Sequence, residues 1–215
     1  MRNRYGNNDI PKMAGRIATC LALAKRDSSA AWKRDRYWYQ DAFRFADSIA
    51  ESLNIQTNTV VGFIAALSPR NSWAGQKKHT KVQLEAALQG LPVPHEGTGD
   101  MKKKAEAIAA GGDPLVHLRG PKVRAFYTAI MLGCASNRHW ESLLDRDEDV
   151  VIDVHAWAIA TGKMNTAPNV TGYRAASQAY HTVADAAGMS VHAVQAVTWA
   201  YWRKHKSLED TNVSL

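Results

Sequence analysis

One carboxylate stands inside an apolar stretch of the chain. Asp153 lies in the run VVIDVHAWAIA, residues 150–160, where His155 is the only other polar residue nearby. A lone charge is expensive to bury, so such a group either caps a helix N-terminus, where backbone N–H groups hold it, or faces a functional cleft. An N-cap for residues 154–161 satisfies the first condition, and a capping residue can also face a pocket. Both interpretations of Asp153 stay open at this point.

Three further polar groups occupy positions where a catalytic or binding residue could lie. Lys122 follows the turn Gly120-Pro121 at the start of an expected helix, where a lysine amine is a candidate nucleophile. The segment Ser68-Pro69-Arg70-Asn71 is a short polar interruption between two helical patterns, and His155 stands two residues after Asp153. Each also has a plain interpretation, as a surface lysine, an interhelical turn and a half-buried histidine.

Helical patterns surround these groups. Apolar residues recur three and four positions apart over residues 36–53, and Thr57-Asn58-Thr59 offers N-cap oxygens to an apolar helix that ends at Ser68-Pro69. Residues 91–100, rich in Pro and Gly, are a candidate connection between two lobes. The β-branched run 150–152 resembles a strand, but no partner strand is visible, and the residues after it fit helical spacing. We therefore predict an all-α fold, with further helices over 73–89, 101–112, 122–132, 171–187 and 190–206.

The net charge of +7 is unevenly distributed along the sequence. The first 109 residues contain 17 basic and 10 acidic residues, whereas the rest contains 10 of each. Such an asymmetry indicates a polyanionic partner, with Lys77, Lys78 and Lys81 among the groups that would meet it. The alternative is that the basic runs are solvated helix faces.

The composition excludes several classes of protein. At 46% hydrophobic and 22% charged residues, the 215-residue chain is neither disordered nor fibrous. It contains no apolar run of roughly 18–20 residues and no apolar signal core, so we expect a cytoplasmic protein outside the membrane. The two cysteines are too few for a four-thiolate site, and the histidines lack ligand spacing, so we expect no metal.

Three segments together resemble one known superfamily. The segment DVHAWAIA, Asp153 to Ala160, resembles the catalytic-aspartate segment of the 8-oxoguanine DNA glycosylases, which reads Asp-Val-His-x-Trp-x-Ile-Ala. Gly120-Pro121-Lys122-Val123 resembles the end of the helix-hairpin-helix motif of the same superfamily, although Leu118 stands where that hairpin has its first glycine. FIAALSPRNSW resembles the helix-to-loop segment whose polar side chains fill the gap left by an extruded base.

The resemblance implies a fold and an activity. The fold is an all-α, two-lobed helical bundle with a helix-hairpin-helix motif, forming one glycosylase-like domain over residues 1–215 whose lobes meet near 91–100. The activity is that of a DNA glycosylase, which flips a damaged or modified base out of double-stranded DNA and cleaves its N-glycosidic bond without a cofactor. We expect a monomer associated with the nucleoid.

The resemblance also implies roles for individual residues. Asp153 stabilises the positive charge that develops on the sugar, and Lys122 forms a Schiff base if the enzyme also nicks the strand as an abasic-site lyase. The expected DNA contacts are Gly120, His155, Arg70, Asn71, Lys77 and Lys78. Trp157, Phe126 and Tyr127 are candidates for stacking on the flipped base, against the alternative of core packing, to which Trp199 and Trp202 are also assigned.

Two other functions stay open. The first is a phage-type base-modification enzyme on the same scaffold, acting on a modified base or nucleotide, and the second is a non-catalytic DNA-binding module. In the second case Asp153 is only a helix cap, and the basic helices hold phosphate.

Overall fold

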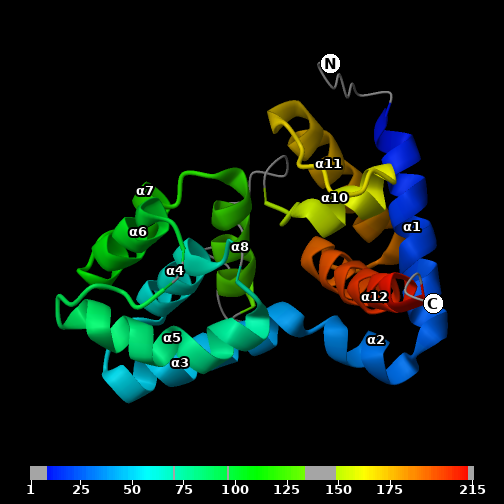
Figure 1. The fold of residues 1–215 in the computed structure, drawn as a ribbon. Helices are drawn as coiled ribbons and strands as arrows, with labels where there is room; N and C mark the ends of the chain where they lie inside the picture. Colours follow the sequence, from blue (N-terminus) through cyan, green and yellow to red (C-terminus); the bar gives the residue numbers. More distant parts are fainter. Residues whose placement is uncertain (1–8, 70, 96, 134–148, 213–215) are drawn as a thin grey trace. The chain divides into compact units, whose positions relative to one another are not determined.

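The computed structural model describes residues 9–69, 71–95, 97–133 and 149–212, with the backbone alone for residues 207–212. Over these ranges the chain forms eleven helices and no strand (Figure 1), so the all-α prediction is confirmed. The chain divides into two compact units. The described parts of residues 1–39 and 144–215 form one, here called the terminal unit, and those of residues 40–143 form the other, here called the middle unit.

The terminal unit is built around one long amphipathic helix. Buried residues recur along α1 at Met13, Ile17, Leu21 and Ala24, so one face of the helix is apolar. The helices α10, α11 and α12 lie around α1 (Figure 1). Its apolar face contributes to a single core that includes the fully buried Trp157. The helices of this unit are α1 (Ile10–Asp27), α2 (Ser29–Asp35), α10 (Val154–Thr161), α11 (Val170–Ala187) and α12 (Val191–Asn212).

Helices α10 and α11 approach each other closely at a glycine. A Cβ added to Gly172 would lie 2.8 Å from Cη2 of Trp157, whose side chain is completely buried and has no room to move. Asn169 caps the same end of α11 by accepting the backbone N–H of Gly172 at 2.8 Å. The glycine therefore sets the distance between the two helices.

The middle unit surrounds a helix that is apolar on every side. All residues of α4 from Val60 to Leu67 are buried, as expected for a helix enclosed by others. It packs against α5, α6, α7 and α8. The helices of this unit are α3 (Trp38–Leu53, whose first two residues belong to the terminal unit), α4 (Thr57–Leu67), α5 (Trp73–Leu88), α6 (Gly99–Ala109), α7 (Pro114–His117) and α8 (Pro121–Leu132).

The Pro- and Gly-rich segment 91–100 lies inside the middle unit. Gln83 of α5 donates from Nε2 to the carbonyl of Pro94 at 2.9 Å, and the backbone N–H of Val93 donates to Glu106 of α6 at 3.2 Å. These bonds attach the segment to two helices of its own unit. The two units divide instead at residues 39–40 and 143–144, so the segment is not the connection between them.

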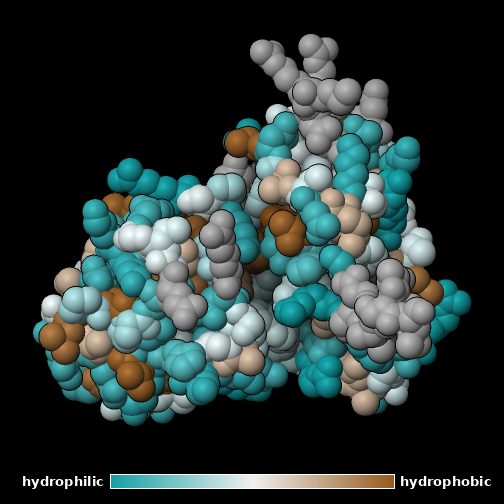
Figure 2. All heavy atoms as spheres, in the orientation of Figure 1, coloured by the Kyte–Doolittle hydropathy of each residue, from teal (hydrophilic) through white to brown (hydrophobic). Residues whose placement is uncertain are grey.

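The helices begin and end close to the predicted positions. The patterns over 36–53, 73–89 and 171–187 correspond to α3, α5 and α11 within about two residues, a normal uncertainty for helix ends. The apolar helix before Ser68-Pro69 is α4, but the predicted capping by Thr57-Asn58-Thr59 is wrong, because the N-cap is Gln56 and makes no side-chain hydrogen bond. Hydrophilic residues cover most of the face drawn in Figure 2, with scattered apolar residues between them, which is usual for a protein surface. In the part of the chain that the structure describes, no helix is long and apolar enough to cross a membrane.

Gly172 provides a test of the helix packing. We expect Gly172→Ala to lower the free energy of unfolding by about 1–3 kcal/mol, because its Cβ collides with a buried ring. The control is Gly15→Ala in the middle of α1, where a Cβ meets nothing within 4 Å. There alanine should stabilise the protein by about 0.5–1 kcal/mol through helix propensity. Urea unfolding of both variants measures the difference, and equal effects would contradict the packing described.

Candidate functional site

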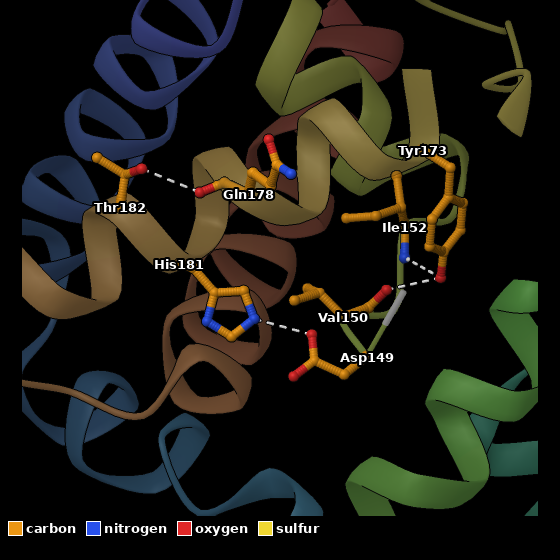
Figure 3. Close-up of polar contacts among 7 residues, drawn as sticks. All are labelled: Asp149, Val150, Ile152, Tyr173, Gln178, His181 and Thr182. Atoms are coloured by element: carbon orange, nitrogen blue, oxygen red, sulfur yellow. Dashed lines mark hydrogen bonds and ion pairs between the residues drawn. The ribbon is translucent and has the colours of Figure 1, made fainter. Parts of the chain in front are cut away.

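The residues leading into Asp153 form a buried, extended segment. Val150, Val151 and Ile152 are all at most 7% exposed, yet they belong to no helix and pair with no strand in the described ranges. Buried backbone N–H and C=O groups need hydrogen-bond partners wherever the chain runs. In this segment the partners are side chains of the helices packed around it (Figure 3).

Tyr173 and Gln195 satisfy opposite edges of the extended segment. The Tyr173 hydroxyl donates to the carbonyl of Val150 at 2.6 Å and accepts the N–H of Ile152 at 3.3 Å (Figure 3). Gln195 of α12 donates from Nε2 to the carbonyl of Val151 at 3.3 Å. Backbone groups of alternate residues in an extended chain point to the same edge, which explains why one hydroxyl reaches both Val150 and Ile152. The two helices thus take the place of neighbouring strands.

A third side chain holds the start of the segment. Nε2 of His181, two turns after Tyr173 on α11, lies 2.8 Å from Oδ1 of Asp149 (Figure 3). The Asp149 side chain is only 2% exposed, and its other oxygen, Oδ2, is buried without a hydrogen-bond partner among the described residues. A buried carboxylate needs such a partner, so the contact with His181 fixes where the chain enters the core.

Asp153 is the N-cap of α10. The sequence predicted either this capping role or a place in a cleft, and the capping role is confirmed. Oδ1 of Asp153 accepts the backbone N–H groups of His155 at 3.0 Å and Ala156 at 2.8 Å. The residue keeps an extended backbone, and the helix starts at Val154. The helix predicted from the spacing of residues after Asp153 is therefore confirmed. The β-branched residues before Asp153 are extended but do not form a strand.

The second oxygen of Asp153 has a partner from a different helix. Oδ2 accepts the indole N–H of Trp199 on α12 at 2.9 Å. The half-buried carboxylate therefore receives three N–H donors, which suits an acceptor-only group. Trp199 lies one turn after Gln195, so a single face of α12 contacts both Val151 and Asp153.

The Trp199 ring is itself enclosed by other side chains. The rings of Trp38 and His155 lie 6.5 and 6.3 Å from it, the second edge-on, and the guanidinium of Arg203 lies over its face at 4.9 Å. Tyr39 is buried nearby and donates its hydroxyl to Oε1 of Gln195 at 2.8 Å. Burial, and then the charge of Asp153, raise the pKa of Tyr39 well above its ordinary value, so this hydroxyl keeps the proton that it donates.

Two of the sequence-predicted residues lie on α10 beside Asp153. His155 is half-buried in the first turn, with its ring against Trp199, so it belongs to the same cluster. Trp157 is fully buried in the core, and its indole N–H donates to Thr166 at 3.1 Å. A base has no exposed ring face to stack on there, so the structure assigns Trp157 to core packing instead.

The predicted residues of the hairpin lie in the middle unit. Gly120 is the N-cap of α8, and Lys122 is half-buried in its first turn. Phe126 is half-buried, whereas Tyr127 is 1% exposed and belongs to the core, so stacking by Tyr127 is also excluded in this structure. Lys122 and Asp153 therefore belong to different units.

The remaining predicted DNA contacts also lie in the middle unit. Lys77 and Lys78 are exposed on α5. Asn71 precedes that helix, and its side-chain amide lies 3.3 Å from Nε2 of His95, so it is held in place. Arg70 lies outside the described residues.

The positive charge is shared between the two units. In the full sequence, residues 1–39 and 144–215 together contain 15 basic and 11 acidic residues and residues 40–143 contain 12 and 9, net charges of +4 and +3. The excess in the first 109 residues is thus a feature of the sequence alone, because residues 1–39 fold together with residues 144–215. The charge asymmetry along the sequence therefore does not coincide with the division into two units.

Four residues that hold the site are not predicted by the sequence: Tyr173, His181, Gln195 and Trp199. A signal existed for one of them, because Gln195 is a polar residue in the apolar run AVQAV, where a buried amide must find a partner. Trp199 was assigned to packing because nothing in the sequence indicates that its N–H meets a carboxylate 46 residues away.

Comparison with known proteins gives the family. Residues 6–206 match a family of unknown function, DUF7178. The chain belongs to this DUF7178 family. No curated protein and no solved structure matches the chain.

Within the described residues of this DUF7178 member, no group of three or more His, Cys, Asp or Glu side chains could hold a metal ion.

The histidine next to Tyr39 predicts how stability depends on pH. Nδ1 of His192 is buried without a hydrogen-bond partner among the described residues, and its ring meets Tyr39 edge-on at 5.7 Å. Burial lowers the pKa of His192 to about 4, against the opposing effect of Asp149 and together with that of His181. The neutral ring is therefore the form that the fold accepts.

We expect this histidine to destabilise the protein progressively as the pH falls from about 6.5 to about 4. Over that range the unfolded chain binds a proton on His192 that the folded chain does not, at a cost approaching about 3 kcal/mol. Urea unfolding at several pH values measures the slope, and His192→Gln should reduce it. The exposed His79→Gln is the control, and an unchanged slope in His192→Gln would contradict the prediction.

Proposed function

We propose that this protein is a DNA glycosylase that excises a damaged or modified base, with Asp153 as its catalytic carboxylate. One observation carries the proposal. Within the segment DVHAWAIA, which resembles the catalytic segment of the 8-oxoguanine DNA glycosylases, the carboxylate is half-buried and oriented through both of its oxygens. A carboxylate held in this way can act on a reacting centre without reorganising.

The reaction needs such a group. When the bond between C1′ of the sugar and the base nitrogen breaks, the electron pair leaves with the base, and positive charge develops on the sugar. A nearby carboxylate stabilises that charge until water adds to C1′ and leaves an abasic site. The base must first be flipped out of the duplex, because C1′ and the leaving base are otherwise enclosed by the stack.

The contacts of Asp153 exceed what a helix cap requires. Asp113 provides the comparison, since it caps α7 with one oxygen, which accepts the N–H of Leu115 at 2.9 Å. Asp153 caps α10 with one oxygen and has the other held by α12. The additional contact restrains the rotation of the carboxylate, which capping alone does not need. This supports a role in chemistry beside the capping role.

The start of α8 supports a contact with DNA phosphate. Gly120 has an ordinary backbone φ of −81°, and an added Cβ would meet only Val123, at 3.7 Å. The fold therefore does not require glycine at this N-cap, whereas a close approach of phosphate to backbone N–H groups favours it. The exposed Lys77 and Lys78 and the net positive charge of both units also favour a polyanion.

The base-release assay tests the proposal. Duplexes that each carry one modified base are incubated with the protein, and abasic sites are counted after alkaline cleavage. We expect the wild type to release one class of base and Asp153→Asn to release it at least about 100-fold more slowly, because charge stabilisation is lost. The matched control is Asp113→Asn, which changes an aspartate that also caps a helix but makes no hydrogen bond to a second helix within the described ranges.

Two results would contradict the glycosylase. If the wild type releases no base but binds undamaged DNA equally well with and without Asp153→Asn, the protein is a binding module. If Asp153→Asn releases base as fast as the wild type, Asp153 is only a cap. A modified nucleotide that stays in the strand, found by mass spectrometry, would instead identify a base-modification enzyme.

Lys122 is tested separately for strand nicking. If its amine attacks C1′, the resulting Schiff base is reduced by borohydride to a stable protein–DNA adduct. We expect this adduct with the wild type and with the control Lys103→Gln, an exposed lysine of α6, and its loss in Lys122→Gln. An adduct that survives Lys122→Gln would remove Lys122 from the lyase role.

A further inference from the structure

We infer that Trp199 is a positioning residue for Asp153, which selects the orientation in which the carboxylate meets the sugar. The inference rests on the proposed function, and it adds a residue that lies outside the segment DVHAWAIA. Its basis is the 2.9 Å hydrogen bond from the Trp199 indole to Oδ2 of Asp153.

The bond fixes the one rotation that capping leaves free. The two backbone N–H groups of α10 both reach Oδ1, so they locate one oxygen but leave the plane of the carboxylate able to tilt. The indole N–H comes from α12 and holds Oδ2. An indole nitrogen donates only and does not titrate near neutral pH, so the orientation that it imposes does not change with its own protonation.

The ring is held firmly enough to act in this way. The rings of Trp38 and His155 lie 6.5 and 6.3 Å from the Trp199 ring, and the Arg203 guanidinium lies over its face at 4.9 Å. Gln195, one turn earlier, is bonded to both Tyr39 and Val151, so α12 itself is attached to the segment that carries Asp153. A catalytic group is effective when its supporting residues are themselves restrained.

The same helix contains a matched comparison. Trp202 lies three residues after Trp199 and packs against the core of the terminal unit, but its buried indole N–H has no hydrogen-bond partner among the described residues. Replacing either tryptophan with phenylalanine removes a similar volume. Only Trp199→Phe also removes a hydrogen bond to Asp153, so the difference between the two variants isolates that bond.

The geometry also affects the standard variant at Asp153. In Asp153→Asn, an amide oxygen that replaces Oδ1 keeps the cap, but the amide NH₂ then faces the indole N–H, and two donors oppose each other. Trp199→Phe relieves this conflict. The double variant should therefore be more stable than expected from the sum of the two single variants, although it stays inactive.

The experiment measures single-turnover base release and the Kd for a duplex with a stable abasic-site analogue. We expect Trp199→Phe to lower the rate roughly 10- to 100-fold with an unchanged Kd, because a misaligned carboxylate affects the reaction and not the binding. Trp202→Phe should stay within about twofold of the wild type in both. Equal rates for Trp199→Phe and the wild type, or equal losses in the two variants, would overturn the inference.

A readout without substrate separates this inference from the proposed function. The Trp199 indole N–H signal, identified in a nitrogen–proton correlation spectrum by its absence in Trp199→Phe, should shift in Asp153→Asn and stay in place in Asp113→Asn. A signal that does not shift overturns the inference whatever the activity. If the wild type releases no base, the proposed function is overturned. If the wild type and Trp199→Phe release base equally fast, the proposed function stands and only the inference about Trp199 is overturned.

Discussion

The need to satisfy the backbone of four buried residues, Asp149 to Ile152, organises the terminal unit. Residues 149–153 run through the core in an extended conformation, and without a neighbouring strand their polar groups depend on side chains. Tyr173 of α11 and Gln195 of α12 bind the backbone of the segment. His181 of α11 and Trp199 of α12 bind the carboxylates of Asp149 and Asp153 at its two ends. The positions of both helices and the direction of the segment are therefore mutually dependent.

The candidate site follows from the same contacts. Hydrogen bonds hold the backbone at Val150, Val151 and Ile152, so the position of Asp153 at the start of α10 is restricted. The carboxylate is then held by two backbone N–H groups and by one indole. This is the kind of preorganisation that stabilising a developing positive charge requires, and it distinguishes Asp153 from Asp113, which caps α7 with one oxygen.

Sequence reasoning found what depends on neighbours along the chain. Helical spacing placed α3, α4, α5 and α11, and the apolar surroundings of Asp153 indicated its capping role. It did not find the contacts of Tyr173 or Trp199, because each joins residues more than twenty positions apart and an amphipathic pattern reports only that a side chain faces inward. Trp157 illustrates the same limit, since the sequence permitted stacking or packing and only burial decided between them.

Hydrogen exchange at one amide tests the central claim, that side chains of the helices hold the extended segment. The Ile152 N–H donates to the Tyr173 hydroxyl, so Tyr173→Phe should raise its exchange rate by roughly tenfold or more. Tyr180→Phe, a change at another fully buried tyrosine of α11 whose hydroxyl lies near Thr198, should leave that rate unaltered. An Ile152 amide that exchanges equally slowly in Tyr173→Phe and in the wild type would show that the segment is held by something else.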